Sequence, residues 1–533
     1  MVERARCHWG WGFADKFPDE GGLRALGGSL GMALGFEAQE PRSPRPIGEA
    51  QLPASTFGAR ARPPFFFDAG PEARIRHTYG RGFRDLARGF VGDFSAAPDA
   101  VAFPLTEDDV EALFAYAERE RLVLVPFGGG TSVVGGVECP RPASREGVVA
   151  VDLRHFDRVL EVDPVSLSAR IQGGAFGPAI EAALGREGLT LRHFPQSFEF
   201  STLGGWIATR AGGHFATLYT HIDDLVESVR MVTPAGPFET RRLPASGAGP
   251  DPNGLVKGSE GTLGLITEAW MKVRRRPRKR AQTSVRFKRF EDGVAAVRRI
   301  VQAPLYPANC RLIDATEALL NGVDFQGNAV LLLAFESDDV PLEGAMQTAV
   351  ELARECGGEP IAATRFQDGV SGGDESSAAW RRSFFEAPYV QSRLLAVGIM
   401  VDTFETACTW RGFEALHAVL TADVTDALKR VCGAGRLTCR FTHAYPDGPA
   451  PYYTFFAPFR RGSELSQWAE VKAAASEAIS RNGATITHHH AVGRVHRPWY
   501  ERERPPLMEA ALRAVKRTFD PAGLLNPGVL FDP

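Results

Sequence analysis

The feature that most constrains this chain is a run of three glycines placed directly after a short apolar stretch. Residues 122–125 (Leu-Val-Leu-Val) are predicted to form a buried strand. The loop that follows consists of Pro126, Phe127, Gly128, Gly129, Gly130, Thr131 and Ser132. Glycines carry no side chain, so their backbone N–H groups can converge on an anion such as a pyrophosphate. Alone the signal is weak, because no Lys completes a P-loop and Val133 stands where a dinucleotide fingerprint needs its third glycine.

Two further segments of the same character follow. The second contains Gln196, Ser197, Phe198, Glu199, Phe200, Ser201 and Thr202, and then Thr209, Arg210, Ala211 and Gly212. The third consists of Glu260, Gly261, Thr262, Leu263, Gly264, Leu265 and Ile266, and leads into an apolar stretch. Glycines and small or hydroxyl side chains let a backbone pack against a flat ligand. Three such segments in this order are far more specific than any one of them.

The composition is typical of a folded protein, and the chain length indicates about two to four domains. Hydrophobic residues make up 44% of the 533 residues and charged residues 23%. The net charge of -3 excludes nucleic-acid binding driven by overall charge. No apolar run approaches the roughly 20 residues of a membrane span, and residues 1–30 do not have the pattern of a signal peptide. Seven scattered cysteines without a C-x-x-C indicate a reducing compartment, so we expect a cytoplasmic protein.

The spacing of apolar residues predicts an α+β fold. Thr106 should cap a helix that ends near Arg121, and residues 176–187 should form another helix. Strands are predicted at 148–153, at 282–290, at 308–314 and at 329–336, with a hairpin joining 158–162 to 168–172, and a last helix at 510–519. The basic stretch 274–280 is predicted to be a solvated linker. Contact with an anionic membrane surface or a phosphate is its alternative.

Three adjacent histidines, His488, His489 and His490, form the second chemical signal. On a strand, His488 and His490 would share a face, so a metal pair is one alternative and a solvated structural cluster is another. Imidazole suits proton transfer and oxyanion stabilisation near neutral pH. We therefore favour an active-site role and assign no metal.

The glycine-containing segments resemble those of flavoproteins with a PCMH-type FAD domain of the vanillyl-alcohol oxidase superfamily. Further motifs resemble the alkyldihydroxyacetonephosphate synthase family and extend the likeness over nearly the whole chain. They are the Trp-Gly-Trp-Gly start at residues 9–12, residues 80–85, Tyr452-Tyr453, the histidine triplet before residues 491–493, and residues 520–528.

The resemblance implies a two-domain α+β fold. We expect an N-terminal arm at 1–92, an FAD-binding domain at 93–280, a cap domain for the substrate at 281–509, and a C-terminal segment at 510–533 that returns to the FAD domain. The first loop, residues 196–202, residues 209–212 and residues 260–266 would wrap the FAD. Gln196 stands where the family often has Asp. Thr131 stands where some relatives attach flavin through His, so non-covalent FAD is implied.

The resemblance also implies catalytic residues. Tyr452 falls on the family's catalytic Tyr, which removes a proton from the substrate. Arg311 and the histidine triplet would steer charge and phosphate, and His193 matches another active-site His. Without the resemblance, Tyr452 is typical of a core strand, Arg311 of a strand end, and His193 of a structural residue. The Tyr452 phenol would act as a base if neighbouring cations lowered its pKa.

The implied reaction exchanges the acyl group of an acyl-dihydroxyacetone phosphate for a long-chain alcohol and releases a fatty acid, as in ether lipid synthesis. The alternative is an FAD-linked oxidase or dehydrogenase of a 2-hydroxy acid or related alcohol, because a fold does not decide chemistry. A flavin-binding protein without catalysis is the third option. The expected partner is a small-molecule or lipid substrate. A peripheral membrane contact and a homodimer are compatible with the sequence.

One position departs from the family pattern. Synthases of this type usually carry an Arg two residues after the Tyr of a Pro-Tyr pair, where it meets the substrate. Here Gln391 occupies that place and Arg393 follows. On a strand the two positions would share a face, so Arg393 could replace the missing cation. Both are therefore predicted to bind substrate.

Overall fold

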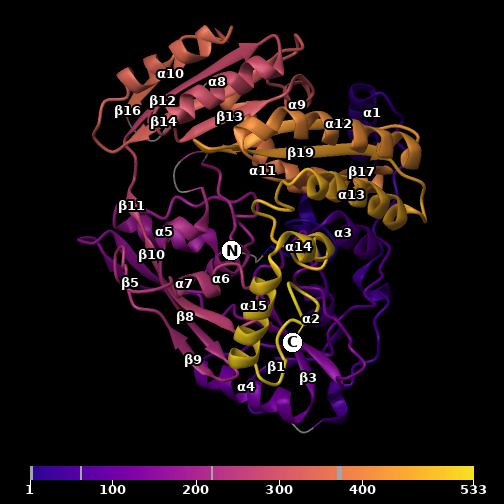
Figure 1. Ribbon diagram of the computed structural model, residues 1–533. Coiled ribbons are helices and arrows are strands. Elements are labelled where there is room, and N and C mark those ends of the chain that lie inside the picture. The colour runs from indigo at the N-terminus through magenta and orange to yellow at the C-terminus, as the bar shows by residue number, and fades with distance from the viewer. Residues whose placement is uncertain (1–3, 61–62, 216, 218–219, 369–374, 533) are drawn as a thin grey trace.

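A computed structural model describes residues 4–60, 63–215, 217, 220–368 and 375–532. The ribbon divides into a lower and an upper part (Figure 1). The lower part carries a four-stranded and a five-stranded sheet, and the upper part carries an eight-stranded sheet with helices on its outer face. The fold is thus a mixed α+β fold, as predicted.

The two lower sheets contain the first half of the chain. The four-stranded sheet has the order β1 (Phe67–Asp68), β2 (Ala100–Ala102), β4 (Gly147–Asp152) and β3 (Leu122–Phe127), with β2, β4 and β3 parallel. The five-stranded sheet is antiparallel, in the order β5 (Val159–Asp163), β6 (Ser168–Gln172), β10 (Leu265–Lys272), β8 (Val226–Thr233) and β9 (Gly236–Glu239). Strand β1 lies within the predicted N-terminal arm, so part of that arm belongs to this sheet.

The upper sheet runs β15 (Glu359–Pro360), β12 (Lys279–Phe287), β14 (Ala329–Ser337), β13 (Asn309–Ile313), β18 (Arg436–Ala444), β19 (Pro449–Pro458) and β17 (Ile399–Glu405). Strand β16 (Arg365–Asp368) also pairs with β12. Helices α8 (Phe290–Gln302), α10 (Glu343–Glu355), α12 (Trp410–Cys432) and α13 (Glu464–Arg481) pack on one face of this sheet. The opposite face of β17, β18 and β19 is left to line the site described below.

Local sequence signals predicted several of these elements correctly. Thr106 caps α4 (Glu107–Arg119) in a reciprocal capping box with Asp109, and the hairpin of β5 and β6 forms as expected. The predicted helix at 176–187 is α5 (Gly177–Arg186). The basic stretch differs, because β11 (Arg274–Arg275) and β12 leave only residues 276–278 as a connection. The linker is therefore shorter than predicted.

The two ends of the chain connect the two parts. Near the N-terminus, Trp9 and Trp11 belong to the hydrophobic core of the upper part, and α1 (Glu20–Leu34) packs against α11 (Glu375–Ala396). Near the C-terminus, α15 (Pro506–Phe519) descends along the lower sheets (Figure 1), and its Lys516 donates to the carbonyls of Thr262 and Leu525. Among the described residues, no helix is both long and apolar enough to cross a bilayer.

Candidate active site

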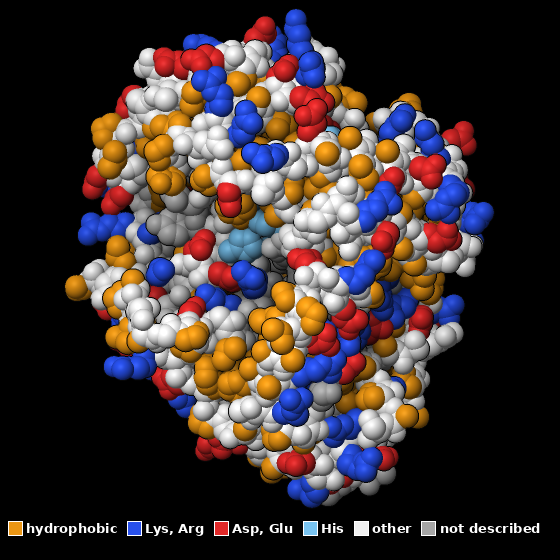
Figure 2. Space-filling view, in the orientation of Figure 1, with side chains coloured by type: hydrophobic (Ala, Val, Ile, Leu, Met, Phe, Trp, Pro, Cys, Tyr) orange, Lys and Arg blue, Asp and Glu red, His pale blue; other side chains and the backbone are white. Residues whose placement is uncertain are grey.

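The candidate site is a cavity of about 490 Å³ between the lower and upper parts. Figure 2 shows histidine side chains in a hollow at the centre of the molecule's face. Twelve of the residues predicted to bind the cofactor line this cavity: Gly128, Gly129, Gly130, Thr131, Ser132, Gln196, Ser197, Ser201, Thr202, Thr209, Ala211 and Gly212. The first and second predicted segments therefore meet in one place, although about 70 residues separate them in sequence.

Glycine is required in the first loop because the second segment lies against its backbone. A side chain at Gly129 would place its Cβ 1.5 Å from the carbonyl oxygen of Phe200, and one at Gly128 would meet the Thr202 hydroxyl at 2.4 Å. Gly130 has φ +67°, a conformation that L side chains rarely adopt. The loop is thus a bare backbone surface fixed by close packing, as a flat ligand with a pyrophosphate requires.

The third segment lies behind this surface. Leu263, Leu265 and Ile266 are buried in the core of the lower sheets. Glu260 accepts hydrogen bonds from the backbone N–H groups of Val492 and Gly493, both at 2.8 Å. Its direct contribution to a cofactor site remains a prediction. The same holds for the other predicted residues that do not line the cavity: Pro126, Phe127, Phe198, Glu199, Phe200, Arg210, Gly261, Thr262 and Gly264.

Strand alternation places Tyr452 in the cavity and Tyr453 in the core. Along β19, Tyr452, Thr454 and Phe456 line the cavity, whereas Tyr453 and Phe455 are fully buried on the opposite face. Tyr452 pairs across the sheet with Glu405 of β17 on one side and with Arg440 of β18 on the other. Tyr452 and Arg440 line the cavity together with the predicted cofactor loop, whereas the Glu405 carboxylate accepts hydrogen bonds from the histidine bend beside them.

Arg440 lies directly over the Tyr452 ring, with the guanidinium carbon 3.9 Å from the ring centroid. Its Nη1 donates to Glu317 of α9 (Ala315–Leu320) at 2.7 Å. Burial raises the pKa of Tyr452, and the cation of Arg440 opposes this without reversing it. The condition for Tyr452 to act as a base, a lowered pKa, is therefore not met in the free protein. Arg440 nevertheless stabilises the phenolate, so it favours a proton leaving the hydroxyl.

The histidine triplet lies in a bend rather than on a strand, so His488 and His490 do not form the predicted strand-face pair. The buried carboxylate of Glu405 holds this bend. It accepts hydrogen bonds from the backbone N–H groups of His488, His489 and His490 at 2.6, 3.1 and 3.0 Å. His489 and His490 line the cavity beside Tyr452, with ring centroids 5.9 and 5.4 Å from that of the phenol. His488 lies behind them against the Tyr445 hydroxyl.

The triplet is uncharged near neutral pH. Burial lowers the pKa of His489 to about 3 and that of His490 to about 4, and lowers the pKa of His488 well below its ordinary value. These rings can therefore accept protons or donate single N–H groups. The steering of charge by the triplet remains a prediction, and Arg440 is the one Lys or Arg among the cavity-lining residues of the described chain.

Arg311 and His193 do not line the cavity. The fully buried Arg311 donates to the carbonyl of His214 at 3.2 Å, and burial lowers its pKa to about 9. His193 is fully buried with its ring edge-on to Trp206, and burial lowers its pKa to about 3. Arg311 is therefore not the surface charge at a strand end that the sequence alone indicated. His193 is not a structural histidine with hydrogen-bond partners for its ring. Their catalytic roles remain predictions.

Gln391 and Arg393 separate because they lie on a helix. In α11, two positions are about 200° apart around the axis, so the shared strand face predicted for them is wrong. Gln391 lines the cavity, where it accepts from the Trp11 indole and donates to the carbonyl of Val401. Arg393 points away, donates to the carbonyl of Lys16 and pairs with Glu386. Arg393 therefore does not supply the missing cation.

Sequence reasoning missed four polar residues of the site: Glu317, Glu405, Arg440 and His443. On β18 the signal was present, because Thr438, Arg440 and Thr442 alternate with Leu437, Cys439 and Phe441. Glu405 ends an apolar strand without any such pattern. Its role depends on residues more than 80 positions away, which no local pattern reveals.

The same cavity has an apolar region. Val401 and Phe456 form a cross-strand pair four residues along β19 from Tyr452, or about 13 Å. Leu26 and Leu30 of α1 also line the cavity and pack in the core cluster that Val401 and Phe456 adjoin. The site thus combines a polar row with an apolar region on one sheet face.

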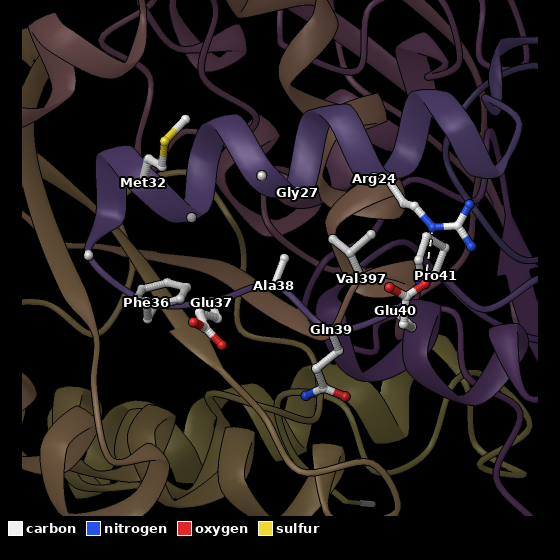
Figure 3. A pocket seen from close by; sticks show the side chains of 13 residues that line it. Arg24, Gly27, Met32, Phe36, Glu37, Ala38, Gln39, Glu40, Pro41 and Val397 are labelled. Atoms are coloured by element: carbon white, nitrogen blue, oxygen red, sulfur yellow. Dashed lines mark hydrogen bonds and ion pairs between the residues drawn. The ribbon is translucent and has the colours of Figure 1, made fainter.

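A second hollow, of about 560 Å³, lies on the other side of α1. Figure 3 shows it between the helix and residues 36–41, with Arg24 reaching Glu40 across it, a 3.0 Å hydrogen bond. Gly27 and Gly31 let the chain approach the helix here, because a Cβ at either would lie within 3 Å of residues 36–38. Its polar lining residues are Arg24, Glu37, Gln39 and Glu40, and neither histidine nor tyrosine is among the described residues that line it.

Comparison with known proteins agrees with this geometry. The family model "FAD binding domain" matches residues 98–240, and "FAD linked oxidases, C-terminal domain" matches residues 276–530. Alkyldihydroxyacetonephosphate synthase of Dictyostelium discoideum is 30% identical over 482 residues, covering 85% of this chain and 77% of that protein. The chain belongs to the FAD-linked oxidase family.

Two further proteins are similar to this chain over most of its length. A solved alkyldihydroxyacetonephosphate synthase superposes with a TM-score of 0.80 at 26% identity, covering 98% of both chains. Glycolate oxidase subunit GlcD of Bacillus subtilis is 26% identical over 447 residues, covering 82% of this chain and 90% of that protein. The cofactor is FAD, and the bare glycine backbone at residues 128–130 fits it because no side chain fills the surface.

Proposed function

We propose that this FAD-linked oxidase family member is an alkyl transferase similar to alkyldihydroxyacetonephosphate synthase. It would exchange the acyl group of an acyl-dihydroxyacetone phosphate for a fatty alcohol. The observation that carries this proposal is the combination, in one cavity, of the glycine loop, the neighbouring side chains of Tyr452 and Arg440, and the apolar region around Phe456. A substrate with a polar head and a long alkyl chain matches such a lining.

Each part of the cavity has a role in this proposal. Tyr452, as its phenolate, takes a proton from the substrate carbon and becomes the neutral phenol, and Arg440, 3.9 Å from the ring centroid, stabilises the phenolate before this transfer. Glu317 keeps Arg440 ionised and in place. The bound FAD would act as an electron sink at this position. Leu26, Leu30 and Phe456 hold the alkyl chain and exclude water.

A second function is favoured by one observation. Gln391 is neutral and cannot make the bidentate, charge-assisted contact that Arg makes with a phosphate. With Arg440 as the one cation among the described cavity-lining residues, a smaller anionic substrate such as a 2-hydroxy acid is the alternative. Glycolate oxidase subunit GlcD provides a relative whose name points to that substrate class.

Anaerobic mixing separates the two functions. The flavin-loaded protein is mixed with palmitoyl-dihydroxyacetone phosphate and hexadecanol, or with a panel of 2-hydroxy acids, while the flavin absorbance is followed. The proposal expects fatty acid release with the flavin oxidised at the end and no electron acceptor consumed. Lasting bleaching by a hydroxy acid, without any fatty acid release from the ester, would replace it with the oxidoreductase function.

A further inference from the structure

The N-terminal arm carries a small hairpin that lies against the second predicted cofactor segment. Its backbone closes through hydrogen bonds of 2.8 and 3.0 Å, and Arg6 pairs with Phe13 across it in an antiparallel bridge. We call residues 5–14 the N-terminal hairpin. Its Phe13 ring meets the Phe200 ring edge-on, with centroids 5.3 Å apart. The hairpin therefore contacts a segment that is predicted to bind FAD, although it lies outside the matched FAD binding domain at residues 98–240.

The tip of the hairpin is held by α11 of the upper part. The backbone N–H of Trp11 donates to the Ser392 hydroxyl at 3.0 Å. Gly12 lies so close to this helix that a Cβ there would be 2.3 Å from the ring of Tyr389. Because the hairpin is packed at its tip and along its side, it holds the Arg6 side chain in one place.

Arg6 contacts the first and second predicted segments at the point where they meet. Its Nη2 donates to the carbonyl oxygen of Gly129 at 3.1 Å, and its guanidinium carbon lies 4.9 Å from the centroid of the Phe200 ring. These are the two residues whose close packing leaves no room for a side chain at position 129. One side chain of the N-terminal hairpin therefore joins both segments.

The hydrogen bond from Arg6 sets the direction of the next backbone N–H. In a trans peptide the C=O and the following N–H point in opposite directions, and the Gly129–Gly130 peptide is trans. The Gly129 carbonyl points to Arg6, so the Gly130 N–H points away from it. Residues 128–132 line the cavity, whereas Arg6 is not among the described residues that line it. The Gly130 N–H is therefore directed to the cavity side of the loop, as an anion site made of backbone N–H groups requires.

Two guanidinium groups beside this loop form no ion pair with any carboxylate of the described chain. Burial lowers the pKa of Arg6 to about 10, so it stays charged at neutral pH, and the carboxylate that favours its charge, Asp152, is already paired with another arginine. The buried Arg81 donates from its backbone to the carbonyl of Ser132 at 2.6 Å. The carboxylate that favours its charge, Asp85, is also paired with another arginine. A buried charge is unfavourable without an opposite charge, and an anion at the loop would supply it.

We propose that Arg6 is a positioning residue for the cofactor, which orients the glycine loop and supplies positive charge to the diphosphate of FAD. The diphosphate is the anionic group of the cofactor that this family binds, and the loop backbone is the surface that can accept it. Arg6 acts through the loop, because the Gly129 peptide lies between its guanidinium and the cavity. The N-terminal hairpin is then part of the cofactor site, whichever reaction the protein catalyses.

The test is the affinity of the protein for FAD. Each flavin-loaded protein is diluted in series, and the free FAD that passes an ultrafiltration membrane is measured by its fluorescence. Arg6→Met keeps the length of the side chain but removes its charge and its donors, so it should raise Kd by roughly 10–100-fold, the effect of losing a charged hydrogen bond. Arg6→Lys keeps a positive charge and a donor, so it should restore most of the affinity.

Arg4→Met is the matched control from the same arm. The Arg4 guanidinium stacks on Phe13 at 4.2 Å but is exposed and paired with Asp15, so its loss should leave Kd unchanged. Wild-type affinity in Arg6→Met, or an equal loss in Arg4→Met, would overturn the proposal. An Arg6→Lys variant as weak as Arg6→Met would overturn it too, because charge would then not be responsible. Should Arg6→Met fold poorly, as judged by circular dichroism, Arg6→Gln takes its place, and equal Kd values for Arg6→Gln and Arg6→Lys would contradict the proposal.

Discussion

At the scale of single residues, the site depends on which face of a strand each side chain occupies. Tyr452 and Tyr453 are adjacent and chemically identical, yet one lines the cavity and the other donates or accepts a hydrogen bond with His417 in the core at 2.9 Å. The sequence motif alone does not tell them apart. The alternation of side chains along β19 distinguishes them, because the buried residues mark which face of the strand points into the core.

Tyr452→Phe should retain the fold and the FAD but lose most turnover. The change removes the phenolic oxygen that takes the proton and preserves the shape of the ring, and general acid–base groups typically contribute about 10²–10⁴-fold. Turnover and flavin absorbance are measured on the same preparation. Tyr453→Phe is the matched control, because its hydroxyl lies on the other face, and should turn over normally. Equal activity in Tyr452→Phe and the wild type would remove Tyr452 from the mechanism.

Gln391→Arg should lower KM for a phosphate ester, whereas Arg393→Ala should leave KM unchanged. The first variant introduces a cation where the cavity has a neutral amide, and a charged hydrogen bond contributes about 1.5–3 kcal/mol. The second removes a side chain that lies outside the cavity. Steady-state kinetics with the ester measures both. A higher KM in Arg393→Ala would show that the helix presents this residue to the substrate after all.

At the scale of secondary structure elements, local signals predicted more than long-range ones. The capped helix α4 and the β5–β6 hairpin depend on residues close in sequence, and both are confirmed. The strand expected around Gln391 is a helix, and Pro388 within it is a residue that normally disfavours helices. The pairing of β13 with β18 joins residues more than 120 positions apart. No local pattern in the sequence predicts that pairing, so the contact between Arg440 and Glu317 could not be predicted.

The junction of the third glycine-containing segment with residues 492–493 should make stability depend on pH. Burial raises the pKa of Glu260 to about 7, against the two backbone N–H donors that oppose it. Because this is above the usual value of 4.5 in the unfolded chain, the folded protein binds more protons in this range. The stability that this group contributes is therefore greatest below about pH 4.5 and falls, by on the order of 3 kcal/mol, as the pH rises from there to about 7, above which it no longer changes.

Urea unfolding of flavin-loaded protein between about pH 5 and about pH 8 measures this dependence. Glu260→Gln cannot ionise, so its stability should change less over the same range than that of the wild type. Identical pH slopes in the two proteins would show that Glu260 is not the group responsible.

At the scale of the whole molecule, two parts of the chain line one cavity, and we expect the cofactor to bind there. The family and FAD were predicted from three ordered segments, and both are confirmed by the comparisons. Non-covalent attachment remains a prediction that depends on one residue, because Thr131 offers no imidazole to bond to the flavin. The first two of these segments pack against each other in the folded protein, as the contact between Gly129 and the carbonyl oxygen of Phe200 shows.

The flavin should leave the protein on acid precipitation. A hydroxyl at position 131 cannot form the histidyl linkage of some relatives, so the cofactor is held by contacts that unfolding breaks. Absorbance of the supernatant and of the pellet measures the partition. Colour that remains in the pellet would show a covalent bond to another residue.

The proposed transferase reaction is tested most directly by analysing its products without any electron acceptor. The flavin-loaded protein is incubated with palmitoyl-dihydroxyacetone phosphate and ¹⁸O-labelled hexadecanol, and lipids are measured by mass spectrometry. We predict an ether product that keeps the label, formed in equal amount with free palmitic acid. Absence of the ether product, together with turnover of a 2-hydroxy acid that requires an acceptor, would contradict the assignment as an alkyl transferase.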